Sequence, residues 1–353
     1  MPVGFVVVVR LFPDIIGVVS HIEGTADGGL HIREACPAET GPTLVWPVTV
    51  SHGRTVLVAE REGCVRRFDA RTGEAIGDPR QQWRVVSYGC AAARVPDGRT
   101  IFVAAGEDGI ARFDVVSGAA YPPAAGEQVF TIWDVAAATL PGGRVIIAGA
   151  GHDGLVYRWD AATGEAIGNP LEGHRISVKA VTTAVSGNGA PLFISGCENG
   201  DVLRWDAATG ARIGEPLPGT IDEVSHLAVV DLPGGRQILA CADTHALHRW
   251  DLADGKPLGC SAVTGKWARL LATHVDSLGT PTAFIWLPGE GENEDAVERV
   301  EQWRLDTGSR IEVNLPVTLR AVFDHGGHTW MVLGEPDGSL VVQPLPRPAQ
   351  RPR

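Results

Sequence analysis

The sequence predicts an all-β protein built from tandem copies of one structural unit. One phrase recurs along the 353 residues: a Gly-containing turn, a short apolar strand, an aromatic–Asp pair and a Thr-Gly turn. The 44 glycines and 24 prolines are typical of a chain with many tight turns. No 3.6-residue helical period and no alternation of strands with helices occurs, which excludes βαβ folds.

The repeated phrase sets the size of the unit. Its clearest copies begin at Gly151 and Cys197, and eight copies can be counted when degenerate ones are included. The residues at the position of the aromatic–Asp aspartate are Glu34, Asp69, Asp114, Asp160, Asp206, Asp251, Arg304 and Pro344. They are 35, 45, 46, 46, 45, 53 and 40 residues apart. A unit of about 45 residues made of strands and turns matches one four-stranded antiparallel propeller blade.

The unit that ends at Asp160 shows each expected strand in order. Residues 132–139 are the inner strand, and a Pro-Gly-Gly turn leads to a second strand over 144–150. The third strand is 155–160, and 165–167 lies at the outer edge. The third strand places bulky residues on both faces by the period of two, with Arg158 on one face and Trp159 on the other. One sheet cannot bury both of its faces, so neighbouring units must stack around an axis.

The number of blades and the domain limits follow from the same count. Eight phrases slightly favour eight blades, in which case only residues 1–5 remain to complete the last blade. Seven blades stay open as the alternative, with 38–45 as the strand that completes the ring. We expect one propeller domain over 1–345, with 1–41 as a degenerate first unit. Residues 346–353 form a Pro/Arg tail that we expect to be disordered.

These motifs resemble the WD-repeat β-propeller family. The resemblance rests on Gly-x-Asp-Gly turns and on the aromatic–Asp pairs Phe68-Asp69, Phe113-Asp114, Trp159-Asp160, Trp205-Asp206 and Trp250-Asp251. It implies a structural network of His174, Ser195 and Trp205, in which Asn199 stands where the family has Asp. The family's Gly-His pair stands at its expected place in the repeat only once, as Gly173-His174, so we expect this network to be incomplete and stability to rest mainly on apolar packing.

Charge and composition exclude several classes of protein. The formal net charge is −12, whereas a nucleic-acid-binding or anionic-membrane-binding protein usually presents a basic face. No apolar stretch is long enough to span a membrane, and no signal peptide is recognisable. The six Cys residues are scattered and form no CxxC, which favours free thiols in a cytoplasmic protein.

An arginine precedes the aromatic residue in five units and shares a strand face with the Asp two positions later. We interpret these residues as a structural ladder between blades, built from Arg–carboxylate pairs and Arg stacked on Trp or Phe. A ring that binds an anion is the alternative. The arginines are Arg67, Arg112, Arg158, Arg204 and Arg249, and the acids are Asp69, Asp114, Asp160, Asp206 and Asp251.

Aromatic and basic residues on the segments that lead into the inner strands are candidates for a binding surface. These segments converge at one rim of the channel, and aromatic and Arg side chains dominate protein interfaces. The alternative is that the tryptophans are core residues between blades. The candidate rim residues are Trp83, Arg84, Phe130, Trp133, Arg175, Lys266, Trp267 and Arg320.

Other features predict no reactive centre. His245 and His248 point to opposite faces of a strand and are poorly placed to share a metal. The acidic segment Glu290–Asp295 is interpreted as a solvated loop, with partner docking or cation attraction as the alternative. No HExxH, P-loop, GxSxG or EF-hand motif occurs.

The favoured function is therefore a monomeric, cofactor-free and non-enzymatic scaffold that binds a protein partner through a propeller rim. This function is implied by the family resemblance, because fold alone does not fix function. Two alternatives remain. The Trp-Asp-Ala-Ala-Thr-Gly phrase also resembles quinoprotein-like propellers, although the Trp expected after the Thr-Gly is missing. A hydrolase or lactonase propeller would hold a channel metal, with Asp134, His226, Asp231 and His274 as candidates.

Overall fold

The computed structural model describes most of the chain between residues 21 and 346. The described ranges are 21–24, 30–33, 43–50, 54–61, 64–69, 76–77, 83–84, 88–124, 131–219, 222–243, 246–262, 269–276, 279–287, 299–316, 319–325, 328–334 and 340–346. For part of the strands in the first sheet and in the last two sheets, the backbone alone is described.

The described residues form β-strands, turns and bends, with no helix among them. In chain order the strands are β1 (His21–Gly24), β2 (Leu30–Arg33), β3 (Thr43–Thr49), β4 (Thr55–Arg61), β5 (Cys64–Asp69), β6 (Trp83–Arg84), β7 (Gly89–Arg94), β8 (Thr100–Gly106), β9 (Gly109–Asp114), β10 (Ile132–Thr139), β11 (Val145–Gly151), β12 (Val156–Asp160), β13 (Val178–Val185), β14 (Pro191–Cys197), β15 (Val202–Asp206), β16 (His226–Asp231), β17 (Gln237–Ala242), β18 (Ala246–Asp251), β19 (Pro257–Ala262), β20 (Arg269–Val275), β21 (Pro281–Leu287), β22 (Arg299–Arg304), β23 (Arg310–Leu315), β24 (Leu319–His325), β25 (His328–Gly334) and β26 (Leu340–Pro344).

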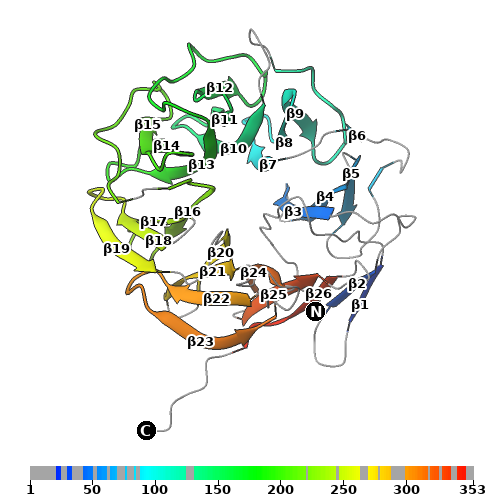
Figure 1. Ribbon diagram of the computed structural model, residues 1–353. Coiled ribbons are helices and arrows are strands. Elements are labelled where there is room, and N and C mark those ends of the chain that lie inside the picture. Colours follow the sequence, from blue (N-terminus) through cyan, green and yellow to red (C-terminus); the bar gives the residue numbers. More distant parts are fainter. Residues whose placement is uncertain are drawn as a thin grey trace, which may run out of the picture.

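Across the described ranges these strands make seven small antiparallel sheets. The sheets are arranged around a central axis, and the strands nearest the axis are β3, β7, β10, β13, β16, β20 and β24 (Figure 1). The sheets are β3–β6, β7–β9, β10–β12, β13–β15, β16–β19, β20–β23 and the five-stranded β1-β2-β26-β25-β24. The all-β prediction is therefore confirmed.

The expectation of eight units is wrong for the part of the chain described, because the first repeat phrase does not form a sheet of its own. Its strand β2 pairs antiparallel with β26, with Leu30 opposite Val342 and Ile32 opposite Leu340. Of the segment 38–45, proposed as the strand that completes a seven-bladed ring, residues 38–42 lie outside the described residues. Chain from Thr43 onward is instead the innermost strand β3 of the next sheet, and Val48 is buried in that sheet's core.

The core lies between successive sheets, as the two bulky faces of each third strand predict. Every residue of β8 and of β11 is buried, because these middle strands have a neighbouring sheet on each face. The cluster between β10–β12 and β13–β15 joins Ile146 to Phe193 and Trp205. Burying large aromatic side chains in this way removes the most apolar area from water and contributes most of the packing energy.

Two further properties concern the described residues as a set. They include no helix that is long and apolar enough to cross a membrane. The four cysteines whose side chains are described, Cys90, Cys197, Cys241 and Cys260, are thiols that form no disulfide. Burial raises the pKa of Cys197 to about 11 and also raises that of Cys241, so both stay protonated and unreactive near neutral pH.

Candidate functional site

The repeated arginines connect each sheet to the next. The guanidinium of Arg112, on β9, donates to the carbonyl oxygens of Ala161 (3.0 Å) and Thr163 (3.1 Å) in the turn after β12. The same group also donates to the carbonyl oxygen of Pro122 at 3.1 Å. We call this contact, an arginine of one sheet bonded to the turn after the third strand of the next, an arginine clasp.

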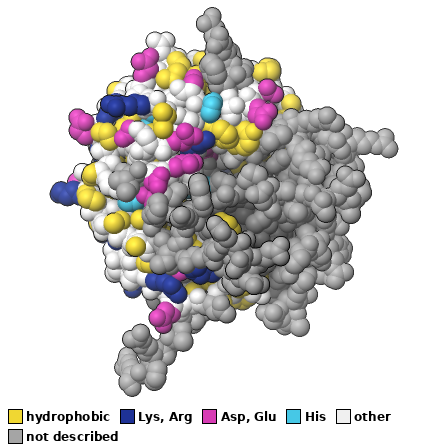
Figure 2. Space-filling model, in the orientation of Figure 1, with side chains coloured by type: hydrophobic (Ala, Val, Ile, Leu, Met, Phe, Trp, Pro, Cys, Tyr) yellow, Lys and Arg dark blue, Asp and Glu magenta, His cyan; other side chains and the backbone are white. Residues whose placement is uncertain are grey.

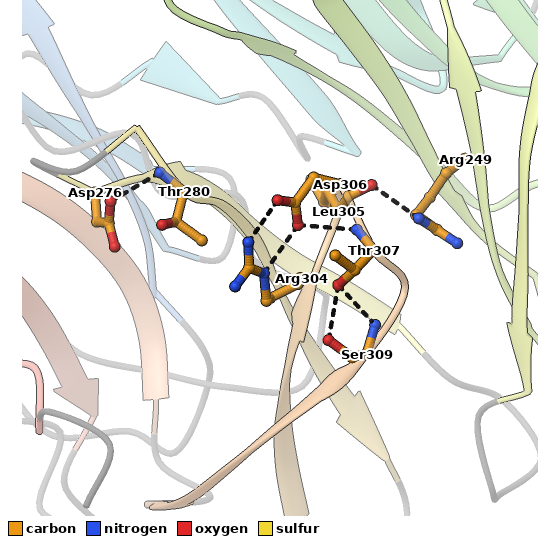
Figure 3. Close-up of polar contacts among 8 residues, drawn as sticks. All are labelled: Arg249, Asp276, Thr280, Arg304, Leu305, Asp306, Thr307 and Ser309. Carbon is orange, nitrogen blue, oxygen red and sulfur yellow. Dashed lines mark hydrogen bonds and ion pairs between the residues drawn. The ribbon is translucent and has the colours of Figure 1, made fainter. Parts of the chain in front are cut away.

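The clasp recurs around the molecule. Arg67 donates to Val115 and Val116, Arg158 to Ala207 and Ala208, and Arg249 to Leu305, in each case at the carbonyl oxygen. Figure 3 shows Arg249 reaching across to Leu305 in the neighbouring sheet. Arg204 approaches the equivalent turn, because a Cβ placed on Gly255 would lie 2.7 Å from its Nη1.

The acceptors of the clasps correct the predicted Arg–carboxylate ladder. They are backbone carbonyl oxygens, and the aspartates instead hold their own turns. Asp160 Oδ1 accepts from the backbone N–H groups of Ala162 and Thr163, and its Oδ2 accepts from Arg144. Asp114, Asp206 and Asp251 accept backbone N–H groups in the same way. The Asp69 side chain lies outside the described residues.

The turn glycines complete each clasp. Gly118, Gly164, Gly210 and Gly308 have positive φ, and a Cβ on any of them would collide with the guanidinium of the preceding sheet. Glycine is therefore required twice, for its backbone conformation and for its missing side chain. Burial lowers the pKa of Arg158, and Asp206 partly offsets that effect.

The network implied by the family resemblance is present in part. Trp205 Nε1 donates to Ser195 Oγ (2.8 Å), which lies 2.6 Å from His174 Nε2. Burial lowers the pKa of His174 to about 4, so the ring that shares a hydrogen bond with the Ser195 hydroxyl is neutral near pH 7. His174 Nδ1 is buried with no hydrogen-bond partner among the described residues. Asn199 bonds Cys197 and Asp201 instead, so the network is incomplete, as expected.

The inner strands all begin at the same edge of their sheets. We call this the leading edge; it carries the starts of β7, β10, β13 and β16 and the turns that follow β8, β11, β14 and β17. The pairing of Ile132 with Gly151 and of Val178 with Cys197 places those strand starts beside those turns. We call the opposite edge the trailing edge. It carries the turns between first and second strands and the turns after the third strands.

Trp133 is at the centre of an aromatic and charged cluster on the leading edge. Its ring is half-buried, with the Tyr88 ring at 4.9 Å and the His152 ring at 5.9 Å between centroids. The Lys179 ammonium lies over the indole at 3.9 Å and pairs with Glu198 at 2.8 Å. Trp133 Nε1 also donates to Ser177 Oγ at 3.0 Å.

We call this set the Trp133 cluster: Tyr88, Trp133, His152, Ser177, Lys179 and Glu198. It draws on three successive sheets, β7–β9, β10–β12 and β13–β15. Tyr88 donates its hydroxyl proton to Glu107 at 2.9 Å. Burial and this hydrogen bond raise the pKa of Tyr88, which keeps the phenol protonated. A cation held against an aromatic face with a carboxylate behind it is a favourable arrangement at a protein surface.

The other predicted rim residues are only partly described. Arg175 is exposed on the segment before β13 and, among the described residues, makes no hydrogen bond, ion pair or ring contact with the Trp133 cluster. Phe130, Lys266 and Trp267 lie outside the described residues. For Trp83, Arg84 and Arg320 the backbone is described, in β6 and β24, and the side chains are not.

Sequence reasoning missed Tyr88, His152, Lys179 and Glu198, although the repeat period points to them. Tyr88, Trp133 and Lys179 are 45 and 46 residues apart, so they occupy one equivalent position in three consecutive units. His152 and Glu198, also 46 apart, share another position in the turn after the second strand. Aligning the units on these two positions would have brought the cluster together.

The channel-metal candidates have other roles. Asp134 is buried, and its carboxylate accepts the N–H groups of Val135 and of Val181 in the next sheet, both at 2.8 Å. His226 lies against Ser225, Asp231 accepts from Gln237, and His274 contacts Thr329. In the described part of the chain, no three His, Cys, Asp or Glu residues are grouped to hold a metal.

His248 forms a buried pair with Asp243 at 2.6 Å and stacks on Trp250, while His245 is not described. The acidic segment Glu290–Asp295 also lies outside the described residues.

The chain matches no protein-family model, and no curated protein matches it at a significant level. The geometry of the site is therefore the basis for any functional assignment.

Proposed function

We propose that the chain is a closed seven-bladed propeller of the WD-repeat type that acts as a non-enzymatic, cytoplasmic scaffold. Its partner is another protein, bound at the leading edge around Trp133. Seven sheets in chain order and the pairing of β2 with β26 support the closed ring. The His174–Ser195–Trp205 contacts support the repeat type.

The observation that carries the binding function is the Trp133 cluster. A tryptophan and a tyrosine are held half-exposed by a lysine, a serine and a neighbouring histidine from three sheets. Rigid aromatic side chains bind with little loss of conformational entropy, and they dominate the binding energy of protein interfaces. Exposed Ile176, on the segment before β13, adds apolar surface to the same edge.

The test is affinity purification with mass spectrometry, using the full chain as bait. We expect Trp133→Ala combined with Arg175→Ala to lose at least one protein that the unchanged chain retains. The matched control is Tyr121→Ala combined with Arg99→Ala. These two residues are also an aromatic side chain and an arginine in contact, with the Arg99 guanidinium carbon 5.2 Å from the centre of the Tyr121 ring, and they do not lie on the leading edge. Both variants are compared with the unchanged chain by circular dichroism and thermal unfolding.

An identical set of captured proteins for the unchanged chain and for the folded Trp133/Arg175 variant would refute the proposed function. So would equal losses in both double variants, because the binding surface would then not be the leading edge.

A further inference from the structure

The charged residues of the two edges are arranged differently. On the trailing edge and its adjoining turns, Arg and Lys side chains pair with acids within their own sheet. Among the described residues these pairs are Arg99–Asp97, Arg144–Asp160, Arg236–Asp251, Lys256–Asp254 and Arg304–Asp306, at 2.5–2.7 Å. Figure 3 shows the last of them, in which Arg304 reaches Asp306. At these five positions of the trailing edge, the charges are therefore paired within the protein.

The leading edge carries an excess of negative charge. Between β7 and β16, its described part consists of the turns after the second strands and the residues that lead directly into the inner strands. This part includes eight exposed or half-buried acids against two basic residues. The acids are Glu107, Asp108, Asp153, Glu172, Glu198, Asp201, Asp222 and Glu223, and the basic residues are Arg175 and Lys179. Of the two basic residues, Lys179 is paired with Glu198 at 2.8 Å. On the face drawn in Figure 2, acidic side chains gather toward the centre near β13 and β16.

An excess of one sign on a surface has consequences for binding. It raises the local concentration of oppositely charged partners and their association rate, and it repels partners of the same sign. On the trailing edge, by contrast, acids are paired with arginines, as in Arg144–Asp160 and Arg236–Asp251. Acids such as Glu107 and Glu172, which have no basic partner among the described residues, are therefore available to a partner on the edge that also carries the Trp133 cluster.

The Trp133 cluster shows which partner group fits. Its own Lys179 lies on the indole face with Glu198 as counter-ion, so the site already holds a cation by aromatic and carboxylate contacts together. Beside it, Tyr88 and its hydrogen-bonded neighbour Glu107 offer a second aromatic face with a carboxylate, at 4.9 Å from Trp133.

We infer that the leading edge binds a basic protein segment, one whose Lys or Arg side chains meet the Tyr88 ring and the acids around the Trp133 cluster. This inference rests on the proposed function and specifies its partner. Salt screens exposed charges, so binding weakens as ionic strength rises.

The test uses a bead-displayed random heptapeptide library selected on the full chain, followed by fluorescein-labelled copies of the selected peptides. We expect selected peptides to be enriched in Lys and Arg. Glu107→Gln, Glu172→Gln and Glu223→Gln, combined in one variant, should weaken their Kd about tenfold. The control variant combines Glu165→Gln, Glu215→Gln and Glu312→Gln, exposed acids elsewhere that change the net charge equally, and should alter Kd less than about twofold.

The remaining outcomes separate this inference from the proposed function. Acidic or apolar peptides that lose binding in Trp133→Ala would overturn the inference and leave the leading edge as the binding surface. Basic peptides weakened equally by both triple variants would also overturn it, because bulk charge would explain their binding. Selected peptides that depend on neither Trp133 nor the leading-edge acids, or the absence of any, would overturn both.

Discussion

The arginine clasp makes a quantitative prediction at Gly164. This residue has φ +79°, and the guanidinium of Arg112 occupies the place that a Cβ would take. Gly142 is the matched control, because it has φ +98° and no atom within 4 Å of the place where its Cβ would be. Gly142→Ala therefore changes the free energy of unfolding only through left-handed backbone strain, which a less flexible unfolded chain partly offsets. We expect the net loss to be about 1 kcal/mol.

Gly164→Ala adds the loss of the clasp to the same strain. Arg112 is almost fully buried, and its guanidinium makes three hydrogen bonds to carbonyl oxygens. A hydrogen bond from a charged donor contributes roughly 1.5–3 kcal/mol, but bonds that share one group are not lost independently. We expect Gly164→Ala to lower the free energy of unfolding by about 3 kcal/mol more than Gly142→Ala does.

The assay is urea unfolding followed by both circular dichroism and tryptophan fluorescence, which also checks that the two transitions coincide. A double-mutant cycle with Arg112→Met isolates the clasp. In the Arg112→Met background, Gly164→Ala should cost only the strain, about 1 kcal/mol. Equal costs for Gly164→Ala and Gly142→Ala, or a coupling energy near zero, would refute the clasp as a source of stability.

Three further predictions concern the described core. Ser195→Ala leaves Trp205 Nε1 and His174 Nε2 without their shared partner and should lower the unfolding free energy by about 2 kcal/mol, measured by urea unfolding; an unchanged midpoint would contradict the network. Burial lowers the pKa of His174 from 6.5 to about 4. Between pH 6.5 and 4, His174 therefore binds a proton in the unfolded chain but not in the folded chain. Stability should therefore fall by on the order of 3 kcal/mol as pH drops from 6.5 to 4, and this component should be missing in His174→Gln; parallel pH profiles of the two proteins would exclude it. Gly89→Ala puts a Cβ 2.9 Å from the Asp134 Cα and 3.0 Å from the Trp133 carbonyl oxygen, so it should separate β7 from β10, lower the melting temperature and weaken partner binding together; binding that survives intact would show that β7 does not position the Trp133 cluster.

The all-β fold could be predicted from the sequence because every unit repeats the same local pattern. The turn glycines, the third strand and the aromatic–Asp pair are each encoded within about 45 residues, and they repeat with little change from Asp69 to Asp251. The number of sheets could not be predicted in the same way. β2 pairs with β26 about 300 residues later, and such a non-local pairing leaves no mark in the local pattern that surrounds Leu30–Arg33.

The arginines show a second limit of sequence reasoning. Their positions between sheets were predictable from the strand period, but their acceptors were not. A carboxylate such as Asp160 is visible in a sequence, whereas the carbonyl oxygen of Ala161 becomes an acceptor only when a turn presents it. The Trp133 cluster was hidden for another reason, because a search for unusual residues finds Trp133 but passes over an ordinary lysine such as Lys179.

Comparing equivalent positions separates the two uses of this repeat. Where the sheets hold one another, the same side chain recurs: Arg at the clasp and Gly at the turn that receives it. At the start of the inner strand, the equivalent residues are Tyr88, Trp133, Lys179 and Ser225. This one position of the repeat therefore carries four different types of side chain. Packing between sheets demands the same solution in every unit, so a position that varies is not set by that packing. The leading edge varies and carries an excess of acidic side chains, and these two independent signs indicate the same surface.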